Sequence, residues 1–507
     1  MREDWVKILY KDVVSKVSTT KNKLKQKEYL TNGKIPIVDQ GLSFIGGYTN
    51  DNEKILKCKL PVIVFGDHTK NIKLINFQFA PGADGTKVLE PNKYIHPKLI
   101  SLLTEILVFK IKDKGYARHY QYIEKEYFPL IPLPEQRAIV SKLESLFSDL
   151  DNGISDLKKA QEQLKIYRQA VLKKAFEGEL TKEWREEIVK THGRASQRKD
   201  ILPKAEELLE QIKQERQKHY EQQLEDWKEA VKTWEENGKE GKKPGEPKTI
   251  KKLLPLTDNE IKSFHNLPKR WRYIKQGEVT EEPKYGTSKK CDYNIDGKGV
   301  IRIPNILEQK IDSTDLKFAV FSEEEKIIYE LKKGDILTIR SNGSVDLVGK
   351  CALIRDVDKA FLFAGYLIRL RPLKGCVNSN YLINCLSSIK IRNQIESKAK
   401  STSGVNNINS GELSSLIIPI CSLKEQHQIV REIESRLSVC DKVEQSIIES
   451  LLKAQALRQS ILKKAFEGKL LSEAEIEKCK QEEDYEPASV LLERIRKDVQ
   501  FGRLNKK

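Results

Sequence analysis

A seven-residue segment occurs twice in this chain, letter for letter, at residues 172–178 and 462–468. The match extends upstream without a gap, and Glu135-Gln136 in the first copy returns as Glu425-Gln426 in the second. Each copy follows a segment that does not repeat as clearly. A repeat this widely spaced is too long for a solenoid, so it indicates the tandem duplication of a two-part unit. Each unit consists of a variable domain followed by a constant helical region.

The constant region has the apolar spacing of a long helix. Between Ile139 and Val171, apolar residues recur at three- and four-residue intervals, and the second copy keeps most of them. Such a stripe predicts a helix that packs lengthwise along a similar helix, and the simplest partner is the other copy. A shorter helical segment, Leu208–Lys213, also returns as Leu491–Arg496, and a Gly-, Lys- and Pro-rich linker follows at 238–247.

The variable segments have the pattern of mixed α/β domains. We expect strands near 35–38, 60–65, 72–75, 300–303, 335–339 and 367–370, and helices at 97–107 and 380–400. Trp271 restarts the unit, because Trp271 and Ile274 echo Trp5 and Ile8 at the chain start. The predicted fold class is therefore α+β, with two α/β domains separated by long coiled-coil-like helices in a tandem duplication. The predicted regions are 1–132, 133–250, 251–420 and 421–507.

Positive charge is concentrated in the variable domains. The chain has a formal net charge of +17 at pH 7. Counting Lys and Arg against Asp and Glu places roughly +8 in residues 1–132 and roughly +7 in residues 267–420. A domain with this excess attracts polyanions and releases counterions when it neutralises phosphates. A merely soluble, lysine-rich surface is the alternative, but this localisation favours nucleic acid as the ligand of the two variable domains.

Composition excludes several other classes of protein. No run of about 18 apolar residues is present, and the N-terminus lacks an apolar signal region, so we expect neither a membrane protein nor an exported one. The eight cysteines are scattered without a Cys-x-x-Cys pair, which fits reduced thiols in a cytoplasmic protein and predicts no metal site. His68 follows Asp67, which could suggest nuclease chemistry, but a polar turn after a strand is the favoured interpretation.

Several stretches together resemble one family. They are Pro134–Val140, Arg168–Gly178 with Leu180, Thr181 and Trp184, and their second-copy equivalents, with Gly47–Thr49, Gly66–Thr69, Tyr285–Ser288, Arg302–Ile306, Gly334–Leu337, Arg340–Ser344 and Ser401–Ile408 in the variable domains. In this order the chain resembles a type I restriction–modification specificity subunit. The resemblance implies two target-recognition domains held apart by an antiparallel, pseudo-twofold pair of helices. It implies a non-catalytic chain that reads an asymmetric, bipartite double-stranded DNA target.

The resemblance also implies partners. Two methyltransferase subunits would dock on the helical repeats, and in a restricting system two translocating nuclease subunits would join them. S-adenosylmethionine, ATP and Mg would then be bound by those partners, with no cofactor on this chain. Three alternatives remain open: a DNA-binding subunit of a methyltransferase-only system, a coiled-coil scaffold that reads nothing, or an enzyme with an unrecognised nuclease site. Leu471-Ser472-Glu473-Ala474 replaces Thr181-Lys182-Glu183-Trp184 in the second copy, so the two docking surfaces need not be equivalent.

Polar side chains in glycine-flanked loops are the candidate DNA contacts. Arg can form two hydrogen bonds with the edge of guanine, and Asn can form two with the edge of adenine, whereas lysines more often bind phosphates. The candidates are Tyr48, His68, Thr69, Lys70, Arg118, Lys289, Lys290, Arg302, Asn305, Arg340, Ser341, Asn342, Ser344, Ser403, Asn406 and Asn407. A simple hairpin turn at Asn342-Gly343 is the competing interpretation there. For partner docking, the candidates within the repeats are Arg168, Leu172, Phe176, Trp184, Arg458, Leu462 and Phe466.

Overall fold

The computed structural model describes residues 2–82, 84–111, 118–192, 203–241, 243–247, 249, 253–399 and 404–504. The chain forms two units, each with a variable domain and parts of the helical regions. Unit 1 consists of residues 1–160 and 446–507, and unit 2 of residues 161–445. Unit 1 therefore combines segments from both ends of the sequence. The division of the sequence into four consecutive regions remains a prediction.

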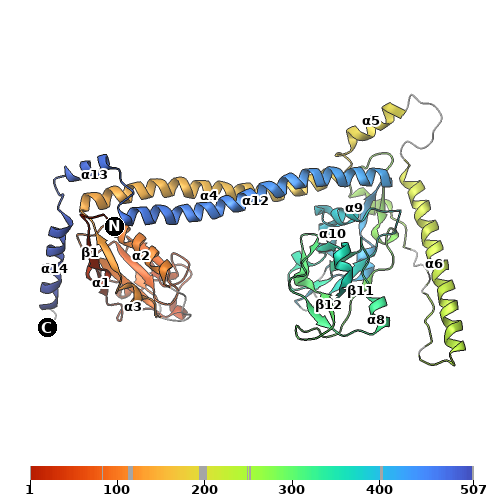
Figure 1. Ribbon diagram of the computed structural model, residues 1–507, viewed down its shortest axis with the longest axis horizontal. Helices are drawn as coiled ribbons and strands as arrows, with labels where there is room; N and C mark the ends of the chain where they lie inside the picture. Colours follow the sequence, from red (N-terminus) through yellow and green to blue (C-terminus); the bar gives the residue numbers. More distant parts are fainter. Residues whose placement is uncertain are drawn as a thin grey trace. The chain divides into compact units, whose positions relative to one another are not determined.

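The variable domain of unit 1 contains two sheets and a short strand pair. The pair joins β1 (Val6–Leu9) to β9 (Tyr127–Leu130). The larger sheet is antiparallel, in the order β2 (Val14–Val17), β8 (Thr86–Pro91), β5 (Val62–Gly66) and β6 (Ile72–Ile75). The smaller sheet has the order β4 (Gly47–Thr49), β3 (Ile35–Val38) and β7 (Ala80–Pro81). The helices are α1 (Tyr10–Val13), α2 (Pro97–Lys110) and α3 (Tyr120–Ile123) (Figure 1).

The variable domain of unit 2 has the same sheet topology. Its strand pair joins β10 (Arg272–Lys275) to β22 (Ile417–Ile420). The larger sheet has the order β11 (Lys284–Tyr285), β20 (Leu367–Leu370), β16 (Ile336–Ile339) and β18 (Cys351–Leu353). The smaller sheet has the order β15 (Lys317–Ala319), β12 (Lys298–Ile301) and β19 (Leu362–Phe363). In both smaller sheets the central strand pairs antiparallel on one side and parallel on the other.

Unit 2 has additional elements in its loops. Two small antiparallel pairs are β13 (Ile306–Leu307) with β14 (Lys310–Ile311), and β17 (Ser341–Asn342) with β21 (Asn406–Asn407). The helices are α7 (Asp258–Lys262), α8 (Glu323–Ile328), α9 (Ser379–Leu386), α10 (Ile389–Lys398) and α11 (Ser410–Ser414). The single helix expected over 380–400 is wrong. Extended backbone at Ser388, which precedes the first residue of α10, divides it in two.

The constant regions form long helices. The first contains α4 (Leu133–Phe176), α5 (Lys182–His192) and α6 (Ala205–Glu236), and the second contains α12 (Leu423–Glu467), α13 (Glu473–Lys480) and α14 (Ala488–Leu504). In the described part of the chain, no helix has a run apolar enough to span a bilayer.

α4 and α12 pack against each other through equivalent contacts in each unit. In unit 2, Arg168 Nη2 lies 2.7 Å from Asp441 Oδ1, and in unit 1, Arg458 Nη1 lies 3.0 Å from Asp151 Oδ1. Arg168 and Arg458 are equivalent positions of the repeat, and so are Asp151 and Asp441. In both units the late part of one helix meets the early part of the other, so within each unit the two helix segments run antiparallel.

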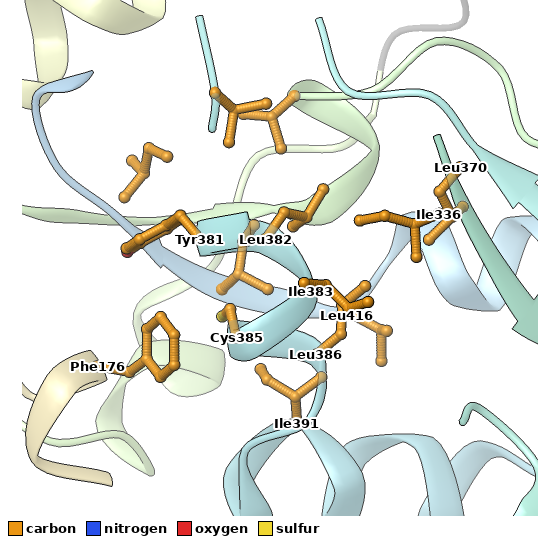
Figure 2. Packing of buried hydrophobic residues seen from close by; sticks show 14 of the residues in the cluster. Phe176, Ile336, Leu370, Tyr381, Leu382, Ile383, Cys385, Leu386, Ile391 and Leu416 are labelled. Atoms are coloured by element: carbon orange, nitrogen blue, oxygen red, sulfur yellow. The ribbon is translucent and has the colours of Figure 1, made fainter. Parts of the chain in front are cut away.

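The hydrophobic cores of the two units use equivalent residues of the repeat. In unit 1, Ile139, Leu143, Leu462 and Leu491 join the core of the variable domain. In unit 2, the equivalent positions Ile429, Ile433, Leu172 and Leu208 do the same. Figure 2 shows Phe176 at the end of α4 beside Tyr381 and Cys385 of α9. The centres of the Phe176 and Tyr381 rings lie 5.3 Å apart. The repeated helices are therefore part of the core beneath each variable domain.

In each unit, a buried glutamate at the start of a long helix accepts a hydrogen bond from the tryptophan that precedes the first strand of the variable domain. In unit 2, Glu425 accepts hydrogen bonds from Trp271 Nε1 at 3.0 Å and Thr181 Oγ1 at 2.8 Å, and it forms an ion pair with Arg185. In unit 1, Glu135 accepts from Trp5 Nε1 at 3.2 Å and from Arg2 Nη2 at 3.0 Å. Burying a carboxylate is tolerated only when it is paired and hydrogen-bonded in this way. The echo between Trp5 and Trp271 is thus confirmed as a shared contact.

The adjacent glutamines fix the variable domains to the long helices. Gln136 Oε1 accepts from the backbone N–H of His96, which precedes α2, at 2.6 Å, and Gln426 Oε1 accepts from Asn378, which precedes α9, at 2.9 Å. Their amide groups donate to the carbonyls of Ile131 and Cys421 at 2.8 and 2.9 Å. This glutamine satisfies a backbone group that the start of a helix leaves free. The repeated Glu-Gln dipeptide is the joint between constant and variable parts.

Candidate nucleic-acid interface

Loops at one edge of the sheets bring the unit 2 candidates together. Arg340 follows β16, and its Nε lies 3.3 Å from Asn407 Oδ1. Its guanidinium lies 4.7 Å from the centre of the Tyr285 ring, which stabilises the cation and orients it. The backbone N–H of Arg340 donates to Tyr366 O at 2.9 Å, so the loop at 364–366 lies alongside. Arg340 is half-buried.

The neighbouring candidates form a two-stranded ribbon. Ser341 pairs with Asn407 and Asn342 with Asn406, although these residues are far apart in sequence. Asn406 Nδ2 donates to Gly343 O at 3.0 Å, and Asn342 Oδ1 accepts from the Ser344 N–H at 2.9 Å. Asn342-Gly343 is therefore not the tip of a simple two-residue hairpin between consecutive strands, because its partner strand is β21. Ser403 lies outside the described residues.

A cleft with a cationic lining opens beside this ribbon. It has a volume of about 630 Å³, and its lining includes Lys289, Lys290, Arg302, Lys317 and Tyr366. The Lys317 ammonium lies 4.9 Å from the Tyr293 ring, and the Tyr366 side chain is 64% exposed. Burial raises the pKa of the Cys291 thiol in the same wall, so this thiol adds no negative charge at neutral pH.

The cations of the cleft differ in how far they are already engaged. Lys289 forms an ion pair with Glu325 and donates to Val320 O at 2.9 Å. Arg302 Nη2 donates to Asp315 O at 2.9 Å, but its buried Nε has no partner among the described residues. Lys290 is exposed, and Lys317 is half-buried. Lys290 and Lys317 are therefore better placed than Lys289 to bind an added anion.

Asn305 requires a correction. Its side chain is 1% exposed, and its amide donates to Asp312 O and Asp315 O at 2.9 Å each. Its carbonyl oxygen accepts from the Arg302 N–H at 2.8 Å. A buried amide with these bonds stabilises the loop and has no surface left for a base. The polar residue type suggested a contact, but only the tertiary structure reveals the burial.

The unit 1 candidates lie at the equivalent edge. His68, Thr69 and Lys70 form the turn between β5 and β6, and this turn corresponds in topology to the connection between β16 and β18 that carries Arg340. Thr69 is exposed, and Lys70 has a φ of 63°, which marks a tight turn. The Thr69 hydroxyl donates to Gln40 O at 2.6 Å, which ties the turn to the loop after β3.

Asp67 is a structural residue of this turn. It is 3% exposed, its Oδ1 accepts from the Tyr120 N–H at 2.9 Å, and Lys87 Nζ lies 3.6 Å from its Oδ2. No cluster of His, Cys, Asp and Glu suitable for a metal ion occurs among the residues that the structure describes. The polar-turn interpretation therefore fits the structure. Of the other two candidates in this domain, Tyr48 is half-buried on β4 and Arg118 is exposed.

Three of the seven docking candidates also require correction, because their side chains are buried. Leu172, Phe176 and Leu462 are between 2 and 6% exposed, and they pack in the cores of their own units. Phe466 packs partly buried against the unit 1 core. Arg168 and Arg458 pair with acidic residues of the opposite long helix. Trp184 is half-buried on α5. Identical residues in a repeat arise from a shared core as readily as from a shared surface, and Leu172, Phe176 and Leu462 belong to the core. The other four residues remain candidates.

Other apolar residues of the long helices are exposed instead. Ile166 of α4 is 70% exposed, and Val439, Leu452 and Leu457 of α12 are 59%, 60% and 51% exposed. None of these residues is identical in the two copies of the repeat, so identity between the copies does not identify them. Their spacing within an otherwise charged helix surface was the available signal.

Comparisons with known proteins agree with this architecture. Residues 268–453 match the family model described as the type I restriction modification DNA specificity domain. The chain is 26% identical over 417 residues to the EcoKI specificity subunit of Escherichia coli strain K12, covering 81% of this chain and 73% of that protein. It is 24% identical over 416 residues to the StySPI specificity subunit of Salmonella potsdam, covering 80% and 73%.

A solved structure has the same fold. That chain comes from work on complex assembly and conformational transition of the type I R-M system. It superposes with a TM-score of 0.58 at 17% identity and covers 93% of this chain and 99% of that one. The chain described here belongs to the specificity subunits of type I restriction–modification systems, the non-catalytic subunits that recognise the DNA target.

Proposed function

We propose that this subunit reads an asymmetric, bipartite DNA sequence, with one half-site read by each variable domain. The observation that carries the proposal is that two domains of one topology have different side chains at the equivalent edge. In unit 2 this edge contains Arg340, the Asn406–Asn407 strand and the cationic cleft, whereas in unit 1 it contains the turn at His68–Lys70. Different edge side chains on equivalent scaffolds favour two different half-sites.

The long helices would set the distance between the half-sites. α4 and α12 each begin in one unit and end in the other. Inserting one heptad into each helix, at equivalent positions, adds roughly 10 Å of helix rise, or about three base pairs. The recognised motif should then tolerate a longer spacer while both half-sites stay the same. A changed half-site in the insertion variant would exclude the spacing role.

Catalysis would belong to other chains. Methylation of a base in duplex DNA requires base flipping and S-adenosylmethionine, and we assign both to two methyltransferase subunits. Exposed apolar residues on the helices, such as Ile166 and Leu452, are candidate contacts for these partners. Two ATP- and Mg-dependent nuclease subunits complete the complex if the system restricts DNA. The assembly would act in the cytoplasm, where the DNA is.

Mapping methylated bases across the genome tests this proposal. Strains with and without the gene should differ by one bipartite methylation motif, which disappears on deletion. Replacing one variable domain by that of another specificity subunit should change one half of the motif and leave the other half intact. If the methylation pattern is the same in all three strains, the subunit does not read DNA in the way proposed.

A further inference from the structure

The loop between β3 and β4 presents hydrophobic side chains to solvent. Leu42 at its tip is 92% exposed, more than any other large hydrophobic side chain among the described residues. Phe44, two residues later, is 52% exposed and packs edge-on against Phe77, with the ring centres 6.1 Å apart. Single exposed apolar residues are common on protein surfaces and need no explanation on their own. The support beneath this loop distinguishes it.

A buried lysine holds the loop from below. Lys73 is 5% exposed, and its ammonium donates to Ser43 O at 2.6 Å and to Asp39 O at 2.8 Å. Asp39 in turn accepts from the Gly41 N–H at 2.9 Å and from the Tyr29 hydroxyl at 3.2 Å. Desolvation lowers the pKa of Lys73, so its burial opposes the charged form that makes these bonds.

The close approach of the Asp39 side chain favours glycine at the end of the same loop. A Cβ at Gly46 would lie 2.7 Å from Asp39 Oδ2, closer than side chains tolerate, and the Gly46 N–H donates to Ile37 O at 2.9 Å. Hydrogen bonds therefore hold the loop on both sides of Leu42, which lies at its tip. A rigid support of this kind lowers the entropic cost of binding through the tip.

The loop belongs to the candidate nucleic-acid interface of unit 1. Gln40 O accepts from Thr69 Oγ1 at 2.6 Å and from Asn71 Nδ2 at 2.9 Å, and both donors lie in the turn that carries His68 and Lys70. Its counterpart in unit 2 is the connection from β12 to β15, which begins with Arg302 in the cationic cleft. The two variable domains thus place different chemistry at the same position.

We propose that Leu42, supported by Phe44, makes an apolar contact with a base of the half-site read by the unit 1 domain. This inference rests on the proposed function. Leucine at a groove floor can contact the C5-methyl group of thymine, or it can enter a base step as a wedge. A protein partner fits less well, because two side chains fall far short of the roughly 800 Å² that each side of a stable interface buries. The excess positive charge of this domain also favours DNA.

Leu42→Ala tests the contact in the full-length subunit purified with its methyltransferase partner. The probe duplexes contain either the methylation motif of this strain or a version with the unit 1 half-site scrambled. The variant should lose roughly tenfold of the preference for the motif, because a mismatched base pair costs a comparable amount. Leu254→Ala is the matched control, since Leu254 is 79% exposed but precedes α7 and belongs to no strand of either variable domain. Both variants should retain the melting temperature of the parent.

Two modified duplexes then identify the base contact. If Leu42 touches a thymine methyl group, replacing thymine by uracil in that half-site should weaken the parent and leave Leu42→Ala unchanged. If Leu42 enters a base step, 2-aminopurine at that step should brighten on binding to the parent and not to the variant. Either result supports the inference.

Two further outcomes contradict the inference or its basis. If Leu42→Ala keeps the full preference of the parent, or loses affinity equally for both duplexes, Leu42 does not contact a base. If the parent itself fails to distinguish the two duplexes, the proposed function fails first, so the two failures can be told apart.

Discussion

The variable domains of units 1 and 2 share a strand order but have different edges. In both, one of the two inner strands of the larger sheet (β5 in unit 1, β16 in unit 2) ends in a connection that carries candidate DNA contacts. In unit 1 this connection is a short turn beside the apolar loop of Leu42, whereas in unit 2 it contains a ribbon beside a cationic cleft of about 630 Å³. The contacts to the constant helices are shared by the two domains, whereas the opposite edge differs in its chemistry.

The joints at the base of the domains differ in one informative detail. Arg185, which pairs with Glu425 in unit 2, has Glu475 at the matching repeat position. In unit 1 the cation comes instead from Arg2, near the start of the chain. A buried glutamate requires a cation beside it, whichever segment of the chain supplies that cation. The two joints are therefore equivalent in chemistry but not in their covalent connections.

The largest effect is expected when a joint is broken. Glu425→Ala removes the acceptor of the Trp271 and Thr181 hydrogen bonds and leaves Arg185 without its carboxylate. Because this leaves an unpaired, largely buried charge, we expect unit 2 to lose about 3–5 kcal/mol of stability. Hydrogen exchange should show the loss in unit 2 with unit 1 unchanged, and Glu135→Ala should do the reverse. An even loss across both units would show that the joints are not separate.

When one edge is altered, base recognition should be lost from one half-site and kept in the other. Arg340→Ala removes a guanidinium that Tyr285 and Asn407 orient, so discrimination at one base pair of the unit 2 half-site should fall by about 1–3 kcal/mol. Methylation mapping should show one relaxed position and an intact unit 1 half-site. Arg436→Ala, an exposed arginine on α12, is the control. A uniform loss across all sequences would reduce Arg340 to a phosphate contact.

The cationic cleft should contribute affinity without selectivity. Replacing Lys290 or Lys317 by Ala should weaken binding to every sequence alike, because lysines hold phosphates and do not identify bases. Each substitution should reduce the slope of log K against log salt by about 1. Titrations of duplex DNA at several salt concentrations measure this slope, and Lys218→Ala on α6 is the control. A change in the methylation motif would place these lysines at base edges instead.

The smallest effect is expected for the contact between α13 and α4. Hydrogen bonds from Lys142 and Ser472 lower the pKa of Glu475 to about 2 from its usual 4.5. A lowered carboxyl pKa stabilises the folded state above pH 4.5, and this stabilisation is lost as the pH falls towards 2. The pair is partly exposed, so its contribution should not exceed about 1 kcal/mol. Lys142→Met should lower the stability of α13 at pH 6, and the difference from the parent should vanish near pH 2.

Repeats made the architecture predictable, whereas tertiary contacts decided the details. The duplicated helices, the restart at Trp271 and the strands near 35–38, 72–75 and 367–370 are confirmed. The shared topology of the variable domains was not foreseen, because strand pairing such as Ser341 with Asn407 joins residues far apart in sequence. The burial of Asn305 depends in the same way on the chain around it.

Docking residues were the least predictable part of the site. Leu172 and Leu462 are identical because each repeat meets an equivalent core, and single-sequence reasoning cannot separate that cause from a shared partner surface. The candidate DNA contacts other than Asn305 stay predictions. Arg340, Asn342, Asn406 and Asn407 come together in one place, as a recognition surface requires.

Unit 1 is assembled from residues 1–160 and 446–507, and this has a consequence for biosynthesis. Leu462, Leu491 and Ile495, which complete its core, are translated only after all of unit 2. Until these residues are made, the part of the first variable domain that they cover has no apolar partner, although its own residues were synthesised first. Unit 2 is continuous in sequence and can close as soon as it emerges. The core of unit 1 can thus be completed only after unit 2 has been synthesised, and a chain truncated before Leu462 would lack these core residues.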